Sequence, residues 1–113
     1  MSQITTHVLD TTKGLPACSV PIRLYQQVAQ GWLLLSQGVT NKDGRIAGLL
    51  ADDMTLAAGT YRMHFDTKVY FDLMQEQSFY PYVDIVFSID GSGSHYHIPL
   101  LLTAYGYSTY RGS

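Results

Sequence analysis

Three histidines near the two ends of the chain have the chemistry of acid–base groups. His95 and His97 are two residues apart in an apolar run, and His7 lies in segment 5–10. A neutral imidazole can accept or donate a proton near pH 7, because its ordinary pKa is about 6.5. The last four residues, Tyr110 to Ser113, add a ring, a guanidinium and a hydroxyl. We therefore expect the two ends of the chain to meet at one site.

Strand-like alternation predicts that these imidazoles lie on outward faces. In the run 95–103 every second residue from Tyr96 is apolar and forms a core face, which leaves His97 on the opposite face. Around His7, the natural core residue is Val8, so His7 also points outward. The outward faces are too apolar for open solvent surface. We expect them to line a groove or a subunit interface.

Other chemistry is less compatible with the spacing of these residues. His-x-His can bind a metal, since imidazoles two apart on a strand share a face. The chain has no cysteine pair and no carboxylate at ligand spacing, so we expect no metal. Ser113 lacks a nucleophile motif such as G-x-S-x-G, which argues against a covalent serine mechanism.

Arg45 follows the turn 41–44, and composition alone leaves open whether it is an ordinary surface charge. His64 is expected to face solvent.

The composition favours a single domain that binds neither nucleic acid nor a membrane. The 113 residues fit one compact domain, and 46% hydrophobic residues are enough for a core. A charged fraction of 14% is low, which indicates subunit interfaces. The net charge of −2 without a basic cluster argues against nucleic acid, and no apolar run approaches the ~20 residues of a membrane helix. The single Cys18 and the lack of a secretory signal favour a cytoplasmic location.

The elements that position these groups are predicted to be short strands. Turn residues recur at short intervals between β-branched and aromatic runs, a pattern typical of an all-β sandwich or barrel. The runs predict strands at 4–11, 20–27, 32–39, 60–67, 81–89, 95–104 and 105–111, with a further short strand at 45–49. One helix is predicted at 68–77, with Asp66 or Thr67 as its cap. We expect a loop at 13–16 and a hairpin turn at 90–93.

Four blocks of the sequence resemble one known family. The blocks are His7–Thr11 with Gly14–Ala17, Thr40–Arg45, His95–Leu102 and Gly106–Ser113. They occur in this order from about residue 4 to the last residue, and they resemble 5-hydroxyisourate hydrolase, the transthyretin-related family of purine catabolism. Transthyretin shares the scaffold but lacks the terminal Tyr-Arg-Gly-Ser and the paired imidazoles.

The resemblance implies that residues 1–113 form a single transthyretin-like hydrolase domain. Its fold would be an all-β sandwich of two four-stranded sheets with one short helix. It would assemble as a homotetramer, a dimer of dimers with active sites in the channel between the dimers. The family's catalytic residues match His7, Arg45 and His97, and Tyr110 and Ser113 match residues that position the substrate. No cofactor is implied.

The resemblance also implies a reaction. The family's substrate, 5-hydroxyisourate, is an unstable bicyclic product of urate oxidation, and its hydrolysis gives 2-oxo-4-hydroxy-4-carboxy-5-ureidoimidazoline. We expect His7 and His97 together to activate the water, and which of them takes the proton is open. Arg45 would stabilise negative charge on the attacked carbonyl. The alternative is a transthyretin-type protein that binds a small molecule without catalysis. The polar groups at His7, His97 and Tyr110 favour catalysis.

Overall fold

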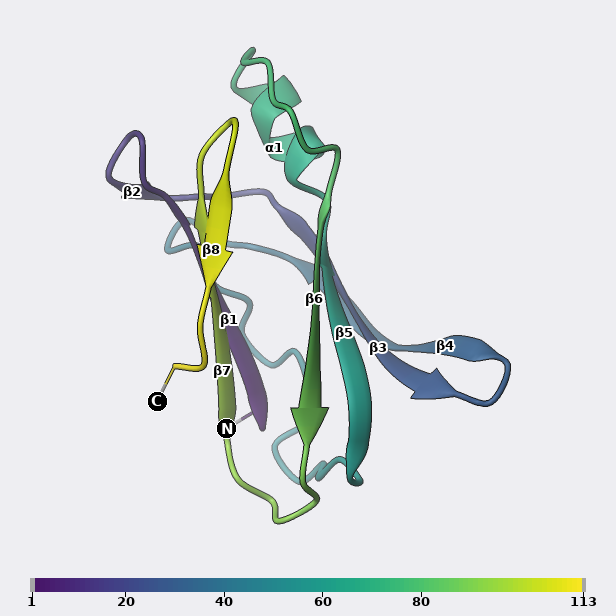
Figure 1. Ribbon diagram of the computed structural model, residues 1–113. Helices are drawn as coiled ribbons and strands as arrows, with labels where there is room; N and C mark the ends of the chain where they lie inside the picture. The colour runs from purple at the N-terminus through teal and green to yellow at the C-terminus, as the bar shows by residue number, and fades with distance from the viewer. Residues whose placement is uncertain (1, 113) are drawn as a thin grey trace.

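Two four-stranded β-sheets packed face to face form this computed structural model, which describes residues 2–112 (Figure 1). The strands are β1 (Ile4–Asp10), β2 (Leu15–Pro16), β3 (Pro21–Val28), β4 (Gly31–Val39), β5 (Gly59–Phe65), β6 (Val83–Ile89), β7 (Tyr96–Leu102) and β8 (Tyr107–Thr109). One sheet has the order β2-β1-β7-β8 and the other the order β4-β3-β5-β6. One helix, α1 (Thr67–Leu73), lies in the described residues. The predicted all-β sandwich with one short helix is confirmed.

Alternate residues of the strands fill the core between the two sheets. In β5, Tyr61, Met63 and Phe65 are buried, whereas Arg62 and His64 between them are only half-buried. This period of two follows from the pleat, which sends successive side chains to opposite faces of the sheet. Further buried apolar side chains on the other strands are Ile4, Val8, Ile22, Leu24, Val83, Ile98, Leu100 and Leu102.

The strands at the two ends of the sequence pair with each other. Strand β1 runs parallel to β7, with all seven residues of β1 in register from Ile4 opposite Tyr96 to Asp10 opposite Leu102. Between the core positions of β1, the side chain of His7 is half-buried, and so is that of His97 on β7. The prediction that both imidazoles lie on the face away from the core is confirmed.

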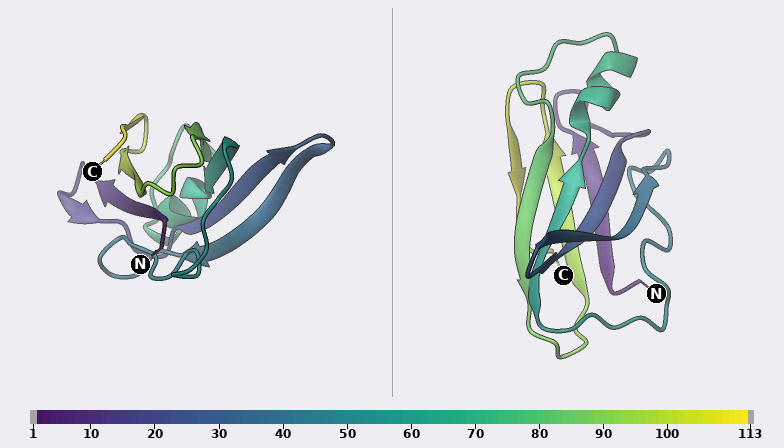
Figure 2. Two further views of the ribbon diagram at one scale, coloured as in Figure 1. Left: turned by 90° about the horizontal axis from the view of Figure 1, so that it is seen from below. Right: turned by 90° about the vertical axis from the view of Figure 1, so that its right-hand side faces the viewer.

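The hairpin of β3 and β4 extends beyond the body of the sandwich (Figure 2). The register of β3 against β4 shifts between Leu24 and Tyr25, which marks a β-bulge at the point where β3 leaves the core. An extra residue on one strand bends the pair and increases its twist. Among residues 2–112, no helix is long and apolar enough to cross a membrane.

The prediction of a short strand at 45–49 was wrong. Arg45 makes a single antiparallel backbone bridge to His7, and the chain then turns through residues 47–50. Gly48 has φ +66°, a left-handed conformation that interrupts an extended strand. Leu49 and Leu50 are buried, so this segment closes over one end of the core instead of joining a sheet.

Two predictions about connections were also wrong. Residues 90–93 link β6 in one sheet to β7 in the other, so they do not form a hairpin. The predicted loop at 13–16 contains β2, in which Leu15 and Pro16 pair with Asp10 and Leu9. Both outcomes depend on which strand each segment meets, and turn residues alone carry no information about that.

Helix α1 is shorter than the predicted range 68–77. Asp66 precedes its first turn, but Oδ1 of Asp66 is hydrogen bonded to Nε2 of His64 at 2.9 Å and does not cap the helix. At the other end, Gln75 has φ +57° and the N–H of Glu76 donates to the carbonyl of Phe71 at 2.9 Å. A left-handed residue followed by such a backward hydrogen bond is a common helix end.

A buried hydrogen bond fixes α1 against the end of β1. The hydroxyl of Tyr70 donates to Oδ2 of Asp10 at 2.7 Å, and both residues are at most 4% exposed. Burial and the neighbouring carboxylate raise the pKa of Tyr70 well above its usual value, so the phenol stays protonated as a donor. The backbone N–H of Lys13 donates to the other oxygen of Asp10 at 3.1 Å.

We expect Tyr70→Phe to lower the free energy of unfolding by about 1–3 kcal/mol, because it leaves Oδ2 of Asp10 buried without this donor. Denaturant unfolding measures the change. Tyr105→Phe is the matched control. Tyr105 is 69% exposed, so its hydroxyl should contribute less than about 0.5 kcal/mol. Equal losses in the two variants would show that the Asp10 contact does not stabilise the fold.

Candidate active site

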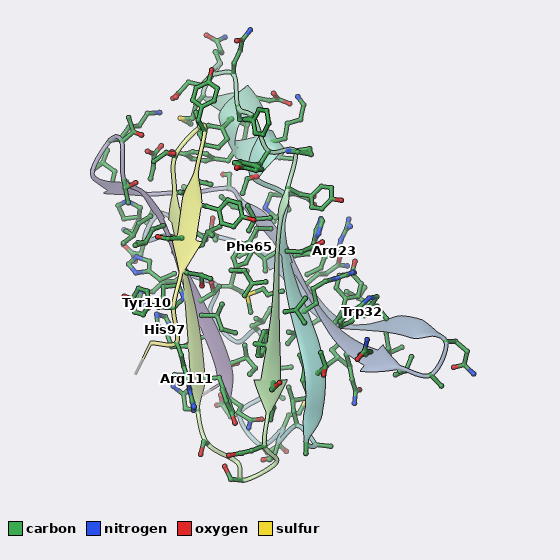
Figure 3. The ribbon with its side chains drawn as sticks, in the orientation of Figure 1. Arg23, Trp32, Phe65, His97, Tyr110 and Arg111 are labelled. Carbon is green, nitrogen blue, oxygen red and sulfur yellow. The ribbon has the colours of Figure 1, made fainter. Side chains whose placement is uncertain are left out.

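The outward face of the β1–β7 pair carries the imidazoles predicted from the sequence. Thr5 lies opposite His97 in the parallel register and His7 lies opposite Pro99, so the polar side chains of the two strands are neighbours. In Figure 3, His97 lies on the side of the β2-β1-β7-β8 sheet away from Phe65, which is in the core. The side chains of His7 and His97 on this face are half-buried within the single chain.

A tight turn delivers Arg45 to the same face. Oδ1 of Asn41 accepts hydrogen bonds from the backbone N–H groups of Asp43 (2.9 Å) and Arg45 (3.1 Å). The carbonyl of Gly44 accepts the N–H of Val8 on β1 at 2.8 Å. Gly44 has φ +74°, and a Cβ atom there would collide with the carbonyl oxygen of Val8. Glycine is therefore required for the turn to lie against β1.

Arg45 and His7 are in direct contact. Nη2 of Arg45 lies 3.3 Å from Nδ1 of His7. A guanidinium only donates, so Nδ1 of His7 is the acceptor and neutral His7 carries its proton on Nε2. Burial and the positive charge of Arg45 lower the pKa of His7, and the backbone and charge of Asp43 act in the opposite direction.

His97 is held from β1 by a threonine hydroxyl. Nδ1 of His97 lies 2.8 Å from Oγ1 of Thr5. Burial lowers the pKa of His97 below its usual 6.5, and the charges of Arg45, His95 and His7 lower it further. Its imidazole is therefore neutral at pH 7 and can accept a proton.

The C-terminal segment crosses the ring of His97. The N–H of Gly112 donates to the carbonyl of His97 at 2.8 Å, and a Cβ atom on Gly112 would lie 2.5 Å from Cδ2 of that ring. Arg111 points elsewhere, with its guanidinium 4.4 Å from the centre of the Tyr96 ring (Figure 3). Tyr110 is 60% exposed. Ser113 lies outside the described residues.

A comparison with models of protein families assigns the chain to a family. A family model described as "HIUase/Transthyretin family" matches residues 4–112. The chain belongs to this family. The 5-hydroxyisourate hydrolase of Mus musculus is 46% identical to it over 99% of this chain and 96% of the mouse protein. The resemblance seen in the four sequence blocks is thus confirmed.

Solved structures of the HIUase/Transthyretin family include both of its named types. The Klebsiella pneumoniae 5-hydroxyisourate hydrolase matches with a TM-score of 0.85 and 36% identity, over 97% of this chain and 98% of that one. Sea bream transthyretin, solved in complex with thyroxine, matches with a TM-score of 0.91 and 34% identity, over 98% and 95%. The scaffold alone does not separate a hydrolase from a binding protein, so the side chains must decide.

Most of the predicted site residues come together on this family scaffold. His7, Arg45 and His97 share one face, and the segment that contains Tyr110 crosses next to them. Sequence reasoning missed Thr5, although it precedes His7 by two residues and therefore shares its outward face. In residues 2–112, no group of three or more His, Cys, Asp or Glu side chains could hold a metal ion.

His64 lies in the other sheet and is separate from this site. Its ring nitrogens lie 2.6 Å from Oδ1 of Asp84 and 2.9 Å from Oδ1 of Asp66, and Tyr82 packs against the ring. The imidazole points away from the core, but its side chain is only 16% exposed. The prediction that His64 faces solvent was right about the side of the sheet on which the imidazole lies. It was wrong about solvent exposure, because Asp84, Asp66 and Tyr82 cover the ring.

Proposed function

We propose that the chain is a 5-hydroxyisourate hydrolase that opens the six-membered ring of its substrate with an activated water. One observation carries the proposal: two imidazoles with lowered pKa values and a guanidinium meet on one outward face. The 46% identity to the mouse protein of that name, and the match to the Klebsiella structure, support the same activity. The product would be 2-oxo-4-hydroxy-4-carboxy-5-ureidoimidazoline.

His97 is the proposed general base. In residues 2–112 its hydrogen-bonded ring nitrogen is Nδ1, which leaves Nε2 for water. His7 is less suited, because its Nδ1 accepts from Arg45 and the backbone of Asp43 also bonds its ring. Nε2 of His97 takes a proton from water as the oxygen attacks the carbonyl carbon. The same proton then passes to the departing nitrogen as the C–N bond breaks.

Arg45 is proposed to stabilise the charge that develops on the attacked carbonyl oxygen. Its guanidinium keeps a fixed positive charge and offers donors in a planar fork. The contact with His7 and the turn at Gly44 hold it in place before the substrate arrives, which is the condition for effective oxyanion stabilisation. We propose that Tyr110 and Ser113 position the substrate, as the family resemblance implies.

We also propose that the chain assembles as a homotetramer, a dimer of dimers. Two features support this assembly. Strands β6 and β8 are sheet edges without a second partner in residues 2–112, and unpaired edges are suited to pairing with another chain. In the β2-β1-β7-β8 sheet and directly after it, Leu15, Tyr107 and Tyr110 leave 43–60% of their area exposed. A mass of four chains by light scattering would support the assembly, and an active monomer would contradict it.

The activity can be tested directly. Freshly generated 5-hydroxyisourate decays spontaneously, and we expect the purified protein to accelerate its loss of absorbance. The product should be the ureidoimidazoline, identified by its mass, which is that of the substrate plus one water. A decay rate equal to that of buffer alone would rule out the proposed hydrolase.

Binding of a small molecule without catalysis is the second candidate. The similarity to sea bream transthyretin, whose structure contains thyroxine, favours it. A binding protein of this type would take up thyroxine, as measured by calorimetry, and leave the decay of 5-hydroxyisourate unchanged. The polar side chains of His7, Arg45 and His97 on the shared face favour the hydrolase.

The pH dependence of kcat/KM should reflect the lowered pKa of His97. A lowered pKa keeps the imidazole neutral, and thus a base, to a lower pH. We expect kcat/KM to be constant around pH 7 and to fall on acidification with an apparent pKa below 6.5. Rates corrected for spontaneous decay between pH 5 and 8 test this. An acid limb centred above 6.5 would contradict a neutral, partly buried base.

Gly112→Ala should lower kcat by about 10- to 100-fold, because its Cβ would push the ring of His97 out of place, and displacements near 1 Å can cost that much. Gly106→Ala is the matched control, since its Cβ would meet only Oγ1 of Thr103 at 3.6 Å. We expect the control to keep kcat within about twofold. Similar kinetics in both variants would show that Gly112 does not hold His97.

A further inference from the structure

One threonine hydroxyl on the outward face lies between two imidazoles. Oγ1 of Thr5 is 2.8 Å from Nδ1 of His97 and 2.9 Å from Nε2 of His95. The arrangement follows from the fold, because Thr5 is the register partner of His97 on β7. His95 directly precedes β7, two residues before His97, so an extended chain sends both imidazoles to the same side. His95 itself is exposed, whereas His97 is half-buried.

The single proton of this hydroxyl couples the two rings. A threonine hydroxyl donates once and accepts through its lone pairs. If Thr5 donates to His97, Nδ1 of His97 is unprotonated and the proton of the neutral ring lies on Nε2. If Thr5 donates to His95, Oγ1 of Thr5 accepts a hydrogen bond from Nδ1–H of His97, and Nε2 of His97 is unprotonated. Only the second arrangement leaves a lone pair for water on the side of His97 away from Thr5.

We propose that Thr5 is a positioning residue that sets the tautomer of His97, and that His95 makes this possible by accepting the hydroxyl proton of Thr5. The inference rests on the proposed function, in which Nε2 of His97 is the base. His95 acts only through Thr5 and does not touch the substrate. The first imidazole of His-x-His thereby determines which ring nitrogen of the second one carries the proton.

The charges around His97 agree with this arrangement. Among residues 2–112, the charged or titratable groups that lower the pKa of His97 are Arg45, His95 and His7, and none of these three is an anion. The positive charge of Arg45 disfavours a second positive charge on His97, so one of the two ring nitrogens stays unprotonated. The hydroxyl of Thr5 is a neutral partner that can accept Nδ1–H without adding a negative charge to the site.

Thr5→Val tests the proposal, because valine keeps the shape of threonine and removes the hydroxyl. We expect kcat to fall by at least about 10- to 100-fold, the effect of losing the partner that orients a metal-ligating histidine, with KM within about threefold. Thr5→Ser should restore kcat to within about threefold of the original. A Thr5→Val variant with unchanged kcat would overturn the proposal.

Thr6→Val is the matched control for Thr5→Val. The hydroxyl of Thr6 also joins β1 to β7, donating to the carbonyl of Ile98 at 2.6 Å, but it is buried on the core face. This variant should lose stability and keep kcat within about twofold. If it lost as much kcat as Thr5→Val, the Thr5 effect would be structural and the proposal would fail.

A double-mutant cycle tests the part played by His95. His95→Ala alone should lower kcat, because the hydroxyl of Thr5 is then free to donate to His97. In the Thr5→Val background the same replacement should have no further effect, since the hydroxyl through which His95 acts is absent. Additive losses would show that His95 acts independently of Thr5 and would overturn its proposed role.

The ring nitrogens can be observed without any substrate. Long-range proton–nitrogen NMR spectra of ¹⁵N-histidine-labelled protein at pH 8 should show neutral His97 with its proton on Nδ1, and Thr5→Val should shift it toward Nε2. An Nε2 proton on His97 in the unmodified protein would overturn the inference. This measurement is independent of activity, so failure to hydrolyse 5-hydroxyisourate would count against the proposed function alone.

Discussion

Replacing His97 with asparagine should lower kcat for 5-hydroxyisourate by about 10²- to 10⁴-fold, the usual contribution of a general base. The amide of asparagine can still bond Thr5 and fits the space of the ring, but it does not take a proton from water. His97 is half-buried on the outward face, so its loss leaves the core intact. Absorbance decay measures kcat, and circular dichroism and light scattering verify the fold and the assembly.

His64→Asn is the matched control for His97→Asn. It removes another half-buried imidazole, from the outer face of the opposite sheet, where the ring contacts Asp84 and Asp66. We expect a loss of stability and little change in kcat. If His97→Asn kept its activity, His7 would have to be the base, and the assignment made from the contact of His7 with Arg45 would be wrong.

Replacing Arg45 with methionine should lower kcat by about 10²- to 10³-fold, the range seen when a donor to a developing oxyanion is lost. A second effect should accompany this loss. The charge of Arg45 lowers the pKa of both His7 and His97, so its removal should raise the apparent pKa of the acid limb of kcat/KM. Methionine keeps much of the length of the side chain and removes the charge.

Arg23→Met provides the control for Arg45→Met. Arg23 is exposed on β3 in the other sheet, so its loss changes the net charge equally without touching the site. We expect its kcat and acid limb to be unchanged. A shift of the acid limb in Arg45→Met alone would tie the lowered pKa to the local guanidinium. Equal shifts in both variants would attribute the change to net charge.

The site contains features that could be predicted from the sequence and contacts that only the structure shows. The turn at 41–44 was visible in the sequence, and so was the outward direction of His7. That Gly44 must lie against the carbonyl of Val8, and Gly112 against the ring of His97, became clear only from the packed chain. A glycine in a sequence does not reveal which atoms approach it.

The sequence by itself determined the class of fold and the face on which each imidazole lies. Both are local properties, because the pleat fixes the alternation of side chains within a strand. It could not determine which strands pair. The parallel register that sets Thr5 beside His97 joins positions 92 residues apart, and the link from β6 to β7 crosses between sheets where the turn residues suggested a hairpin. Such pairings depend on how all the apolar faces are buried at once, so only the tertiary structure decided them.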